Sequence, residues 1–119
     1  IVKNFFSRNI NCIYFSSSRA LKLDNGISMY ASTKKGIQSF VKSMALEYGN
    51  LGLNFRVISL GLFDGGLEKT ISEKTRKNIF RRSSIKKNIQ TNQLYKVIEF
   101  IIEDKTGNGS TIQCDNGYF

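Results

Sequence analysis

The chain has 119 residues, of which 40% are hydrophobic, and it carries a formal net charge of +9. This length predicts one domain, and no apolar run approaches the roughly 18 residues of a membrane-spanning helix. The first six residues also lack the charged start and long apolar core of a signal peptide. Cys12 and Cys114 show no metal-ligand spacing and no histidine accompanies them. We therefore expect buried, reduced thiols, no metal site and a cytoplasmic protein.

Hydrophobic periodicity predicts alternating strands and helices along the chain, without internal repeats. Residues 1–8 are typical of the tail of a helix, and residues 11–16 of a buried strand that ends in a serine-rich loop. A turn at 24–26 leads into a helix from residue 28 or 29 to residue 48. Its apolar residues recur every three or four positions, which predicts one buried face. That face comprises Ile37, Phe40, Val41, Met44, Ala45 and Tyr48.

The second half of the chain continues the alternation. Residues 53–60 and 110–114 are predicted strands, separated by a charged amphipathic helix over 68–82 and an apolar helix over 91–104. Thr91 is expected to be the N-cap of the apolar helix. Its inward residues are expected to be Leu94, Val97, Ile98, Ile101 and Ile102. Strand–helix–strand order with buried strands predicts an α/β fold with a parallel sheet and right-handed crossovers.

Ligands of such sheets bind beyond the carboxyl ends of the strands. Ser17 follows the first complete strand, Tyr30 lies at the start of the next helix, and Gly61 to Gly66 follow the second strand. Because parallel strands end at the same edge of the sheet, we expect these three parts of the chain to converge there.

The residue types at this edge suggest proton transfer. Lys34 lies four residues after Tyr30, a spacing that places both side chains on one face of a helix. A phenol, with a reference pKa of about 10, is a poor acid or base at neutral pH, but a nearby ammonium favours the phenolate. A hydroxyl such as that of Ser17, thirteen residues before Tyr30, can hydrogen-bond the substrate oxygen that the phenol protonates. Taken singly, an interfacial tyrosine and a surface lysine would be the simpler interpretation.

Five stretches in register resemble the short-chain dehydrogenase/reductase family. The family's strand-end serine and its Tyr-x-x-x-Lys helix resemble residues 15–18 and 30–36, and the rest of that helix resembles 39–47. Its next strand, with the exit from it, resembles 54–61, and its terminal strand resembles 106–117. The resemblance implies a Rossmann-like, doubly wound parallel sheet in three α/β/α layers.

The resemblance also implies an activity: an NAD(P)-dependent oxidoreductase that interconverts a ketone and a secondary alcohol by hydride transfer. By this resemblance Tyr30 would be the acid or base, and Lys34 would hold the ribose hydroxyls of the cofactor. Ser17 would orient the substrate oxygen, and is preferred over Ser16 and Ser18 because its spacing to Tyr30 suits the family. NAD and NADP are not distinguished, and the intact enzyme is expected to be a homo-oligomer.

Further cofactor contacts are expected in the loop after the second strand. Gly61 stands at the family's glycine, and the backbone groups of Leu62 and Phe63 could reach the nicotinamide carboxamide. Two positions depart from the family: Leu60 replaces a proline and Gly65 replaces a threonine.

No glycine-rich dinucleotide fingerprint is present, since the glycines at 61, 65 and 66 have the wrong spacing. Residues 1–119 are therefore expected to be the C-terminal catalytic half of one NAD(P)-binding domain, without the N-terminal dinucleotide-binding half. The alternative is a catalytically incompetent member of the family that acts as an interaction or remnant module.

Basic residues concentrate between Lys69 and Lys87. They form either a solvated helix face or a surface that attracts an anionic substrate, carrier or cofactor. Phe80 is the only aromatic residue among them, which argues against nucleic-acid binding. The substrate is expected to be a carbonyl or alcohol, either a 3-oxoacyl group on an acidic carrier or a sugar-linked alcohol.

Overall fold

The computed structural model describes residues 9–22, 24–65 and 69–119. Within these ranges three parallel strands form one sheet in the order β1-β2-β3. The strands are β1 (Ile10–Ser17), β2 (Leu53–Leu60) and β3 (Thr111–Cys114). Their register pairs Ser17 with Leu60 and Leu60 with Cys114, so all three strands end at one edge. The parallel sheet predicted from the sequence is thus confirmed.

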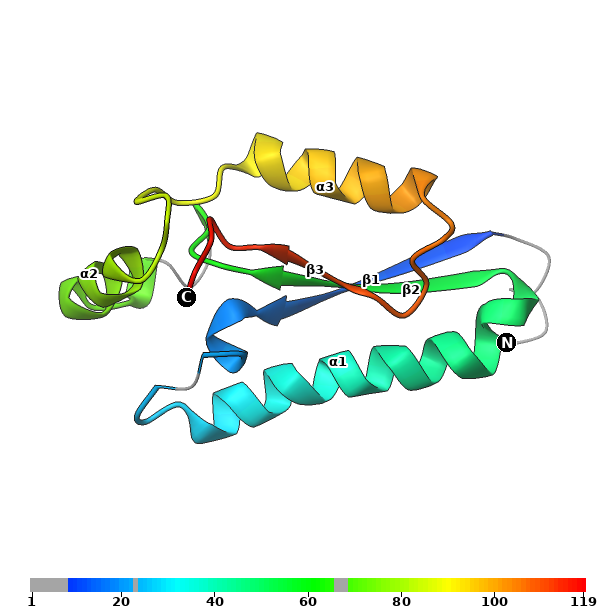
Figure 1. The fold of residues 1–119 in the computed structure, drawn as a ribbon, viewed down its shortest axis with the longest axis horizontal. Helices are drawn as coiled ribbons and strands as arrows, with labels where there is room; N and C mark the ends of the chain where they lie inside the picture. The colour runs from blue at the N-terminus through cyan, green and yellow to red at the C-terminus, as the bar shows by residue number, and fades with distance from the viewer. Residues whose placement is uncertain (1–8, 23, 66–68) are drawn as a thin grey trace.

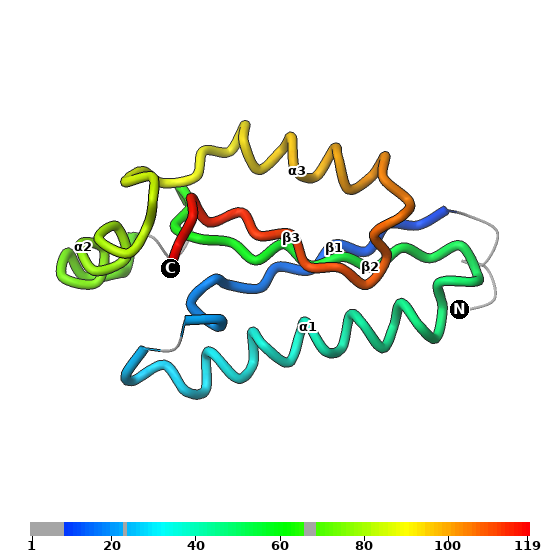
Figure 2. Tube along the Cα trace, viewed as in Figure 1, coloured from blue at the N-terminus to red at the C-terminus, as the bar shows by residue number. Residues whose placement is uncertain are grey.

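Helices cover both faces of this sheet (Figure 1). Helix α1 (Ser28–Tyr48) packs on one face and α3 (Thr91–Glu103) lies on the other, while α2 (Glu73–Arg81) lies beyond the carboxyl ends of the strands. The arrangement is the three-layer α/β/α architecture that the family resemblance implies. The backbone trace in Figure 2 also brings the C-terminal residues beside α2.

The core lies between α1 and the sheet. Val41, Phe55 and Val57 are buried at its centre, and the partly buried apolar residues of α1 that pack on them are Ile37, Met44, Ala45 and Tyr48. The helix has the predicted bounds. Only Phe40 departs from the predicted inner face: it is 48% exposed, although its ring meets the edge of the Tyr14 ring at a centroid distance of 5.7 Å.

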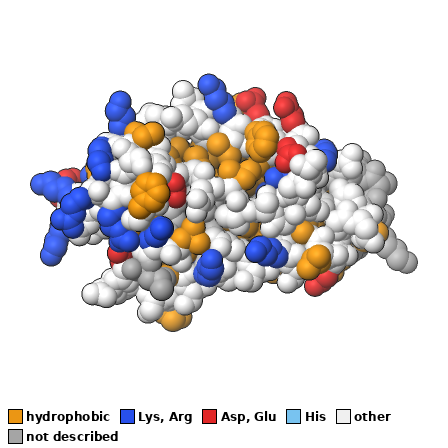
Figure 3. Space-filling model, viewed as in Figure 1, with side chains coloured by type: hydrophobic (Ala, Val, Ile, Leu, Met, Phe, Trp, Pro, Cys, Tyr) orange, Lys and Arg blue, Asp and Glu red, His pale blue; other side chains and the backbone are white. Residues whose placement is uncertain are grey.

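The bounds of α2 differ from the prediction. The expected helix over 68–82 begins only at Glu73, because the Ser72 hydroxyl accepts the Thr75 N–H at 3.2 Å and caps the first turn. Residue 68 itself lies outside the described residues. Figure 3 shows Lys and Arg side chains gathered at the end of the molecule where α2 lies.

Helix α3 also corrects two expectations. Its N-cap is Gln90 rather than Thr91, and the Gln93 side chain accepts the Gln90 N–H at 2.9 Å. Ile101 is fully buried as predicted, but Ile102 is 47% exposed. One residue further along a helix turns the side chain by about 100°, which carries Ile102 off the inner face.

A buried arginine joins α3 to the sheet. Arg56 of β2 is 2% exposed and donates to Asn54 Oδ1 at 3.3 Å and to Ser110 Oγ at 3.1 Å. It also donates to the Asp104 carboxylate at 2.6 Å and to the Asp104 carbonyl at 2.9 Å. Gly107 is required here, because a Cβ at this position would lie 2.3 Å from the guanidinium.

The remaining expectations concern smaller features. The predicted turn at 24–26 is present, with Gly26 in the left-handed region at φ 79°. Cys12 and Cys114 are free thiols, half-buried rather than fully buried, and burial raises the pKa of both. None of the helices in the described ranges is both long and apolar enough to cross a membrane. The helix expected over residues 1–8 lies outside the described residues.

Candidate active site

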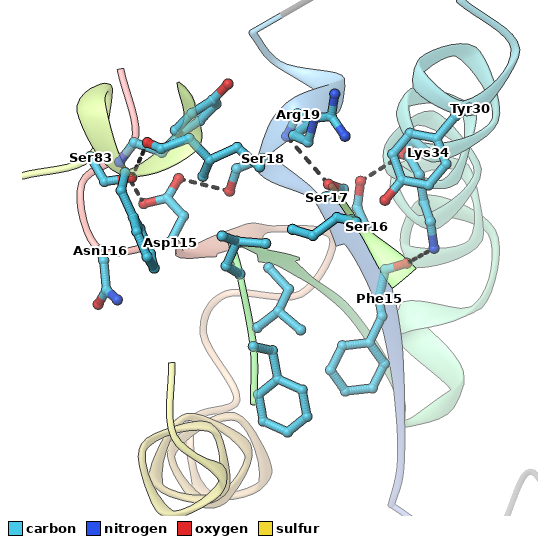
Figure 4. Close-up of a pocket in the computed structure, with 18 of the residues that line it drawn as sticks. Phe15, Ser16, Ser17, Ser18, Arg19, Tyr30, Lys34, Ser83, Asp115 and Asn116 are labelled. Atoms are coloured by element: carbon cyan, nitrogen blue, oxygen red, sulfur yellow. Dashed lines mark hydrogen bonds between the residues drawn. The ribbon is translucent and has the colours of Figure 1, made fainter. Parts of the chain in front are cut away.

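A pocket of about 540 Å³ opens at the edge where the strands end. It collects residues from the end of β1, the start of α1, the loop after β2, the end of α2 and the C-terminal segment (Figure 4). The candidates Ser17, Tyr30 and Lys34 all line it, as do Gly61, Leu62 and Phe63. The structure therefore brings all six candidate residues to one pocket; Gly66, at the end of the expected loop, lies outside the described residues.

The three consecutive serines have different hydrogen-bond partners. Ser16 donates to the Lys34 carbonyl at 2.7 Å, and Ser18 donates to the Asp115 carboxylate at 2.8 Å. Ser17 instead accepts the Arg19 N–H at 3.3 Å and caps the short 3-10 turn η2 (Ser18–Ala20). In the described part of the chain the Ser17 proton has no acceptor. Of the three serines, only Ser17 thus keeps a hydroxyl donor free for a ligand.

Tyr30 and Lys34 lie one turn apart near the start of α1. Lys34 Nζ donates to the carbonyl of Phe15 at 3.1 Å, so the ammonium is held at the end of β1. Tyr30 is 38% exposed, and its hydroxyl has no hydrogen-bond partner among the described residues. Figure 4 shows the Tyr30 and Lys34 side chains facing the end of β1 that carries Ser17. A phenol, an ammonium and a free hydroxyl donor therefore share one cavity.

The loop after β2 is shaped by a close approach to β3. A Cβ on Gly61 would lie 2.8 Å from the Asp115 Cα, and the Gly61 N–H donates to the Cys114 carbonyl at 2.8 Å. Only glycine fits here without moving the backbone. Further on, the Leu62 carbonyl accepts the Ile89 N–H at 2.7 Å, and the Asp64 N–H donates to the Ile89 carbonyl at 2.9 Å.

Two backbone donors in this loop stay available. Within the described ranges the N–H groups of Leu62 and Phe63 have no hydrogen-bond partner, and both residues line the pocket. The Asp64 carboxylate accepts from Asn88 at 2.6 Å and also from Gln90, which attaches the loop to the segment before α3. The loop thus presents two free donors on an anchored backbone.

Asp115 is a pocket residue that the sequence did not single out as a site. Besides the Ser18 hydroxyl, its carboxylate accepts the N–H groups of Gly117 at 3.1 Å and Tyr118 at 3.4 Å. Asp115 therefore ties the 3-10 turn η2, which begins at Ser18 directly after Ser17, to the C-terminal segment. The position was accessible to the same argument that selected Gly61, because Asp115 directly follows the last strand.

Some residues of the basic stretch are held by the protein itself. Arg82 donates to the Asp24 carboxylate at 2.8 Å, Arg81 donates to Asn78 at 3.4 Å, and Lys86 donates to the Arg81 and Ser83 carbonyls. Lys87 lies on the pocket rim, and its ammonium has no partner among the described residues. The free positive charge next to the pocket is therefore smaller than the sequence suggests.

A parallel sheet between two helical layers, with a pocket at its carboxyl edge, defines a Rossmann-like α/β protein. A sequence profile of the family described as enoyl-(acyl carrier protein) reductase matches residues 2–119. The chain belongs to this family and thus to the short-chain dehydrogenases/reductases.

The following three relatives are distant from this chain and longer than it. The chain is 22% identical over 96 residues to 3-oxoacyl-(acyl-carrier-protein) reductase FabG of Pseudomonas aeruginosa, which covers 79% of this chain and 39% of the relative. Among solved structures, 4-hydroxyisoleucine dehydrogenase complexed with NADH superposes with a TM-score of 0.79 at 20% identity, over 98% of this chain and 50% of that one. A variant of actinorhodin polyketide ketoreductase with NADPH gives a TM-score of 0.77 at 14% identity, over 89% and 46%. The chain therefore spans half or less of the length of each of these relatives.

Proposed function

We propose that this chain is the catalytic part of an NAD(P)-dependent oxidoreductase that interconverts a ketone and a secondary alcohol. One observation carries the proposal: Ser17, Tyr30 and Lys34 share a pocket at the carboxyl edge of the sheet, and Ser17 is the one serine of three with a free donor. Membership of the short-chain dehydrogenases/reductases supports it.

The roles of the residues follow from their groups. Tyr30 exchanges its hydroxyl proton with the substrate oxygen, and Ser17 donates a hydrogen bond to that same oxygen and orients it. Lys34 places a positively charged ammonium in the same pocket, held by its hydrogen bond to the Phe15 carbonyl. All three act on one oxygen atom, which fits a carbonyl–alcohol interconversion.

The described residues fit one end of a nicotinamide cofactor. Lys34 could hold ribose hydroxyls, and the free N–H groups of Leu62 and Phe63 could hold the carboxamide. A bound NAD or NADP would supply or accept the hydride. The described ranges offer no glycine-rich turn for the pyrophosphate, so this chain presents a half-site.

The walls of the pocket favour an acyl substrate over a sugar. Ile71, Ile79, Phe80 and Tyr118 line it, which suits a hydrocarbon chain better than a polyhydroxylated ring. The Pseudomonas relative is named as a reductase of 3-oxoacyl groups on a carrier protein. We therefore place a 3-oxoacyl substrate first and a sugar-linked alcohol second.

A carrier would dock on the basic side of α2. Arg81→Glu should weaken binding of an acidic carrier protein, because the Arg81 guanidinium is exposed and, among the described residues, donates only to Asn78 of its own helix. Arg82 is unsuitable for this test, since reversing its charge would break its ion pair with Asp24. Unchanged carrier binding in Arg81→Glu would remove the argument for a carrier.

A non-catalytic interaction module is the second candidate, because the chain spans half or less of its relatives. Calorimetric titration of NADH and NADPH into the full chain tests both functions. Lys34→Ala is the diagnostic variant, and Lys42→Ala, two turns further along α1 and outside this pocket, is the matched control.

Saturable binding that Lys34→Ala abolishes and Lys42→Ala preserves would support the cofactor half-site. Binding that both variants weaken equally would point to general attraction of an anion by a basic protein. No binding to the full chain would favour the interaction module.

A further inference from the structure

Arg82, directly after α2, joins three separate segments of the chain. Its guanidinium donates to Asp24 Oδ1 at 2.8 Å and to the backbone oxygen of Phe119 at 2.9 Å. The same group stacks on the Tyr118 ring at 5.1 Å from the centroid. In return the Phe119 N–H donates to the Arg82 carbonyl at 2.8 Å. The turn before α1, the end of α2 and the C-terminal segment therefore meet at one side chain.

The end of α2 and the C-terminal segment line the pocket, although Arg82 itself and the turn residues 24–26 do not. Ile79, Phe80 and Ser83, beside Arg82 in sequence, belong to the lining, and so does Tyr118, on which it stacks. The wall formed by α2 is thus tied to the wall formed by the C-terminal segment.

Asp24 extends this network to the catalytic side. Its second carboxylate oxygen lies 3.4 Å from Arg19, which also lines the pocket. The backbone N–H of Arg19 donates to Ser17 Oγ at 3.3 Å. A continuous series of contacts therefore runs from the end of α2, through Asp24 and Arg19, to the serine of the site.

The geometry of the Arg82 contacts contributes more to holding these segments than their charge does. The Arg82 and Asp24 side chains are 37% and 32% exposed, and an exposed ion pair alone contributes little. Arg82 combines this pair with a second hydrogen bond and an aromatic stack, which its planar fork permits and a lysine ammonium does not reproduce. Loss of the Arg82 guanidinium should therefore loosen the three segments that it contacts and leave the rest of the fold unchanged.

We propose that Arg82 is a positioning residue, which holds the α2 wall over Ser17 and Tyr30 and thereby sets how tightly the body of the substrate is bound. This rests on the proposed function, because it assigns the α2 wall to the substrate.

Hydrogen exchange of the full chain tests the positioning with neither cofactor nor turnover. Arg82→Lys should accelerate exchange of the α2 amides by about tenfold or more, while the amides of β2 keep their rates. Arg81→Lys is the matched control and should leave both sets unchanged. Asp24→Asn, which removes the shared carboxylate from the other side, should reproduce the acceleration in α2.

Two outcomes of the exchange experiment would overturn the proposal. Unchanged α2 amides in Arg82→Lys would show that the contacts do not hold the wall. Equal acceleration in α2 and β2 would show a general loss of stability instead of positioning. Either result stands regardless of whether the chain is an oxidoreductase.

Kinetics separate positioning from a purely structural role. If the proposed turnover is measured, Arg82→Lys should raise the KM of the carbonyl substrate by about fivefold, with kcat and the cofactor KM within about twofold of the original. A fall in kcat at unchanged substrate KM would contradict the assignment. Absence of turnover in the unchanged chain would count against the proposed function and leave the exchange result intact.

Discussion

The first half of β2 and the pocket beyond its carboxyl end hold polar groups of opposite character. In the first half, Arg56 is almost fully buried and bonds to Asn54, Ser110 and Asp104. Beyond the last residue of the strand, the pocket holds Tyr30, whose hydroxyl has no hydrogen-bond partner in the described part of the chain. One region satisfies its polar groups with the protein alone and the other leaves them open.

The difference separates structural from functional polarity. A buried polar network is stable only when its members are satisfied, so the Arg56 network holds one geometry of β2, α3 and the loop before β3. A binding site needs donors and acceptors that the ligand will satisfy. The donors of Ser17, Leu62 and Phe63, which have no acceptor among the described residues, meet this need. Mutations in the first region should therefore change stability, and mutations in the second should change ligand chemistry.

The largest effect is expected from Arg56→Met, which removes the centre of the buried network. Asn54 and Ser110 would lose a donor, and we expect a loss of about 3 kcal/mol in the free energy of unfolding. Urea denaturation followed by circular dichroism measures it. A variant as stable as the original chain would show that apolar packing replaces the network. The Arg56 network would then not be what stabilises this part of β2.

Gly61→Ala should have the next largest effect, because its Cβ would press on the Asp115 backbone at 2.8 Å. We expect a loss of about 2 kcal/mol as β2 and β3 separate at their carboxyl ends. Gly36→Ala is the control: nothing lies within 4 Å of a Cβ there, in the middle of α1. That variant should instead gain about 0.5 kcal/mol from helix propensity. Equal effects at the two glycines would contradict the close approach.

Asp104 makes the stability of the buried region depend on pH. The hydrogen bond from Arg56, followed by those from Thr106, holds the pKa of the Asp104 carboxyl well below its ordinary value. Because the folded pKa is depressed, the contribution to stability is complete above the unfolded pKa of about 4 and is lost as the pH falls further.

Asp104→Asn should therefore be less stable than the original chain at neutral pH, and the difference should shrink from about pH 5 to about pH 2. Urea midpoints of both chains across this range measure the change. A constant difference would mean that the ionisation of Asp104 is not linked to folding.

The two regions also differ in how far the sequence predicted them. The periodicity of α1 and the apolar strand β2 gave their bounds directly, because local pattern decides them. The Arg56 network could not be foreseen, since an arginine in a strand is usually exposed and its partners Asp104 and Ser110 arrive from 48 and 54 positions away. The N-cap of α3 was misplaced by one residue because Gln90 and Gln93 provide the capping hydrogen bond that Thr91 was expected to give.

At the site, the residue types and spacing predicted which side chains meet, because the carboxyl ends of parallel strands share an edge. Ser17 was chosen over its neighbours because its spacing to Tyr30 suits the family that the chain resembles. The physical distinction lies in long-range hydrogen bonds, from Ser16 to Lys34 and from Ser18 to Asp115. The role of Asp115 depends on the same long-range contact. Sequence patterns describe neighbours along one element, and these contacts join different elements.

The smallest effect on stability is expected from Tyr30→Phe, which is the most direct test of the open region. The Tyr30 hydroxyl makes no hydrogen bond to the described residues and the side chain is 38% exposed, so its removal should change the free energy of unfolding by less than about 0.5 kcal/mol. If Tyr30 is the acid and base of the proposed reaction, carbonyl reduction should fall by about a hundredfold or more in the same variant. A loss of stability comparable to that of Arg56→Met would show that Tyr30 supports the fold. Lost turnover at unchanged stability would show that its hydroxyl acts on the substrate.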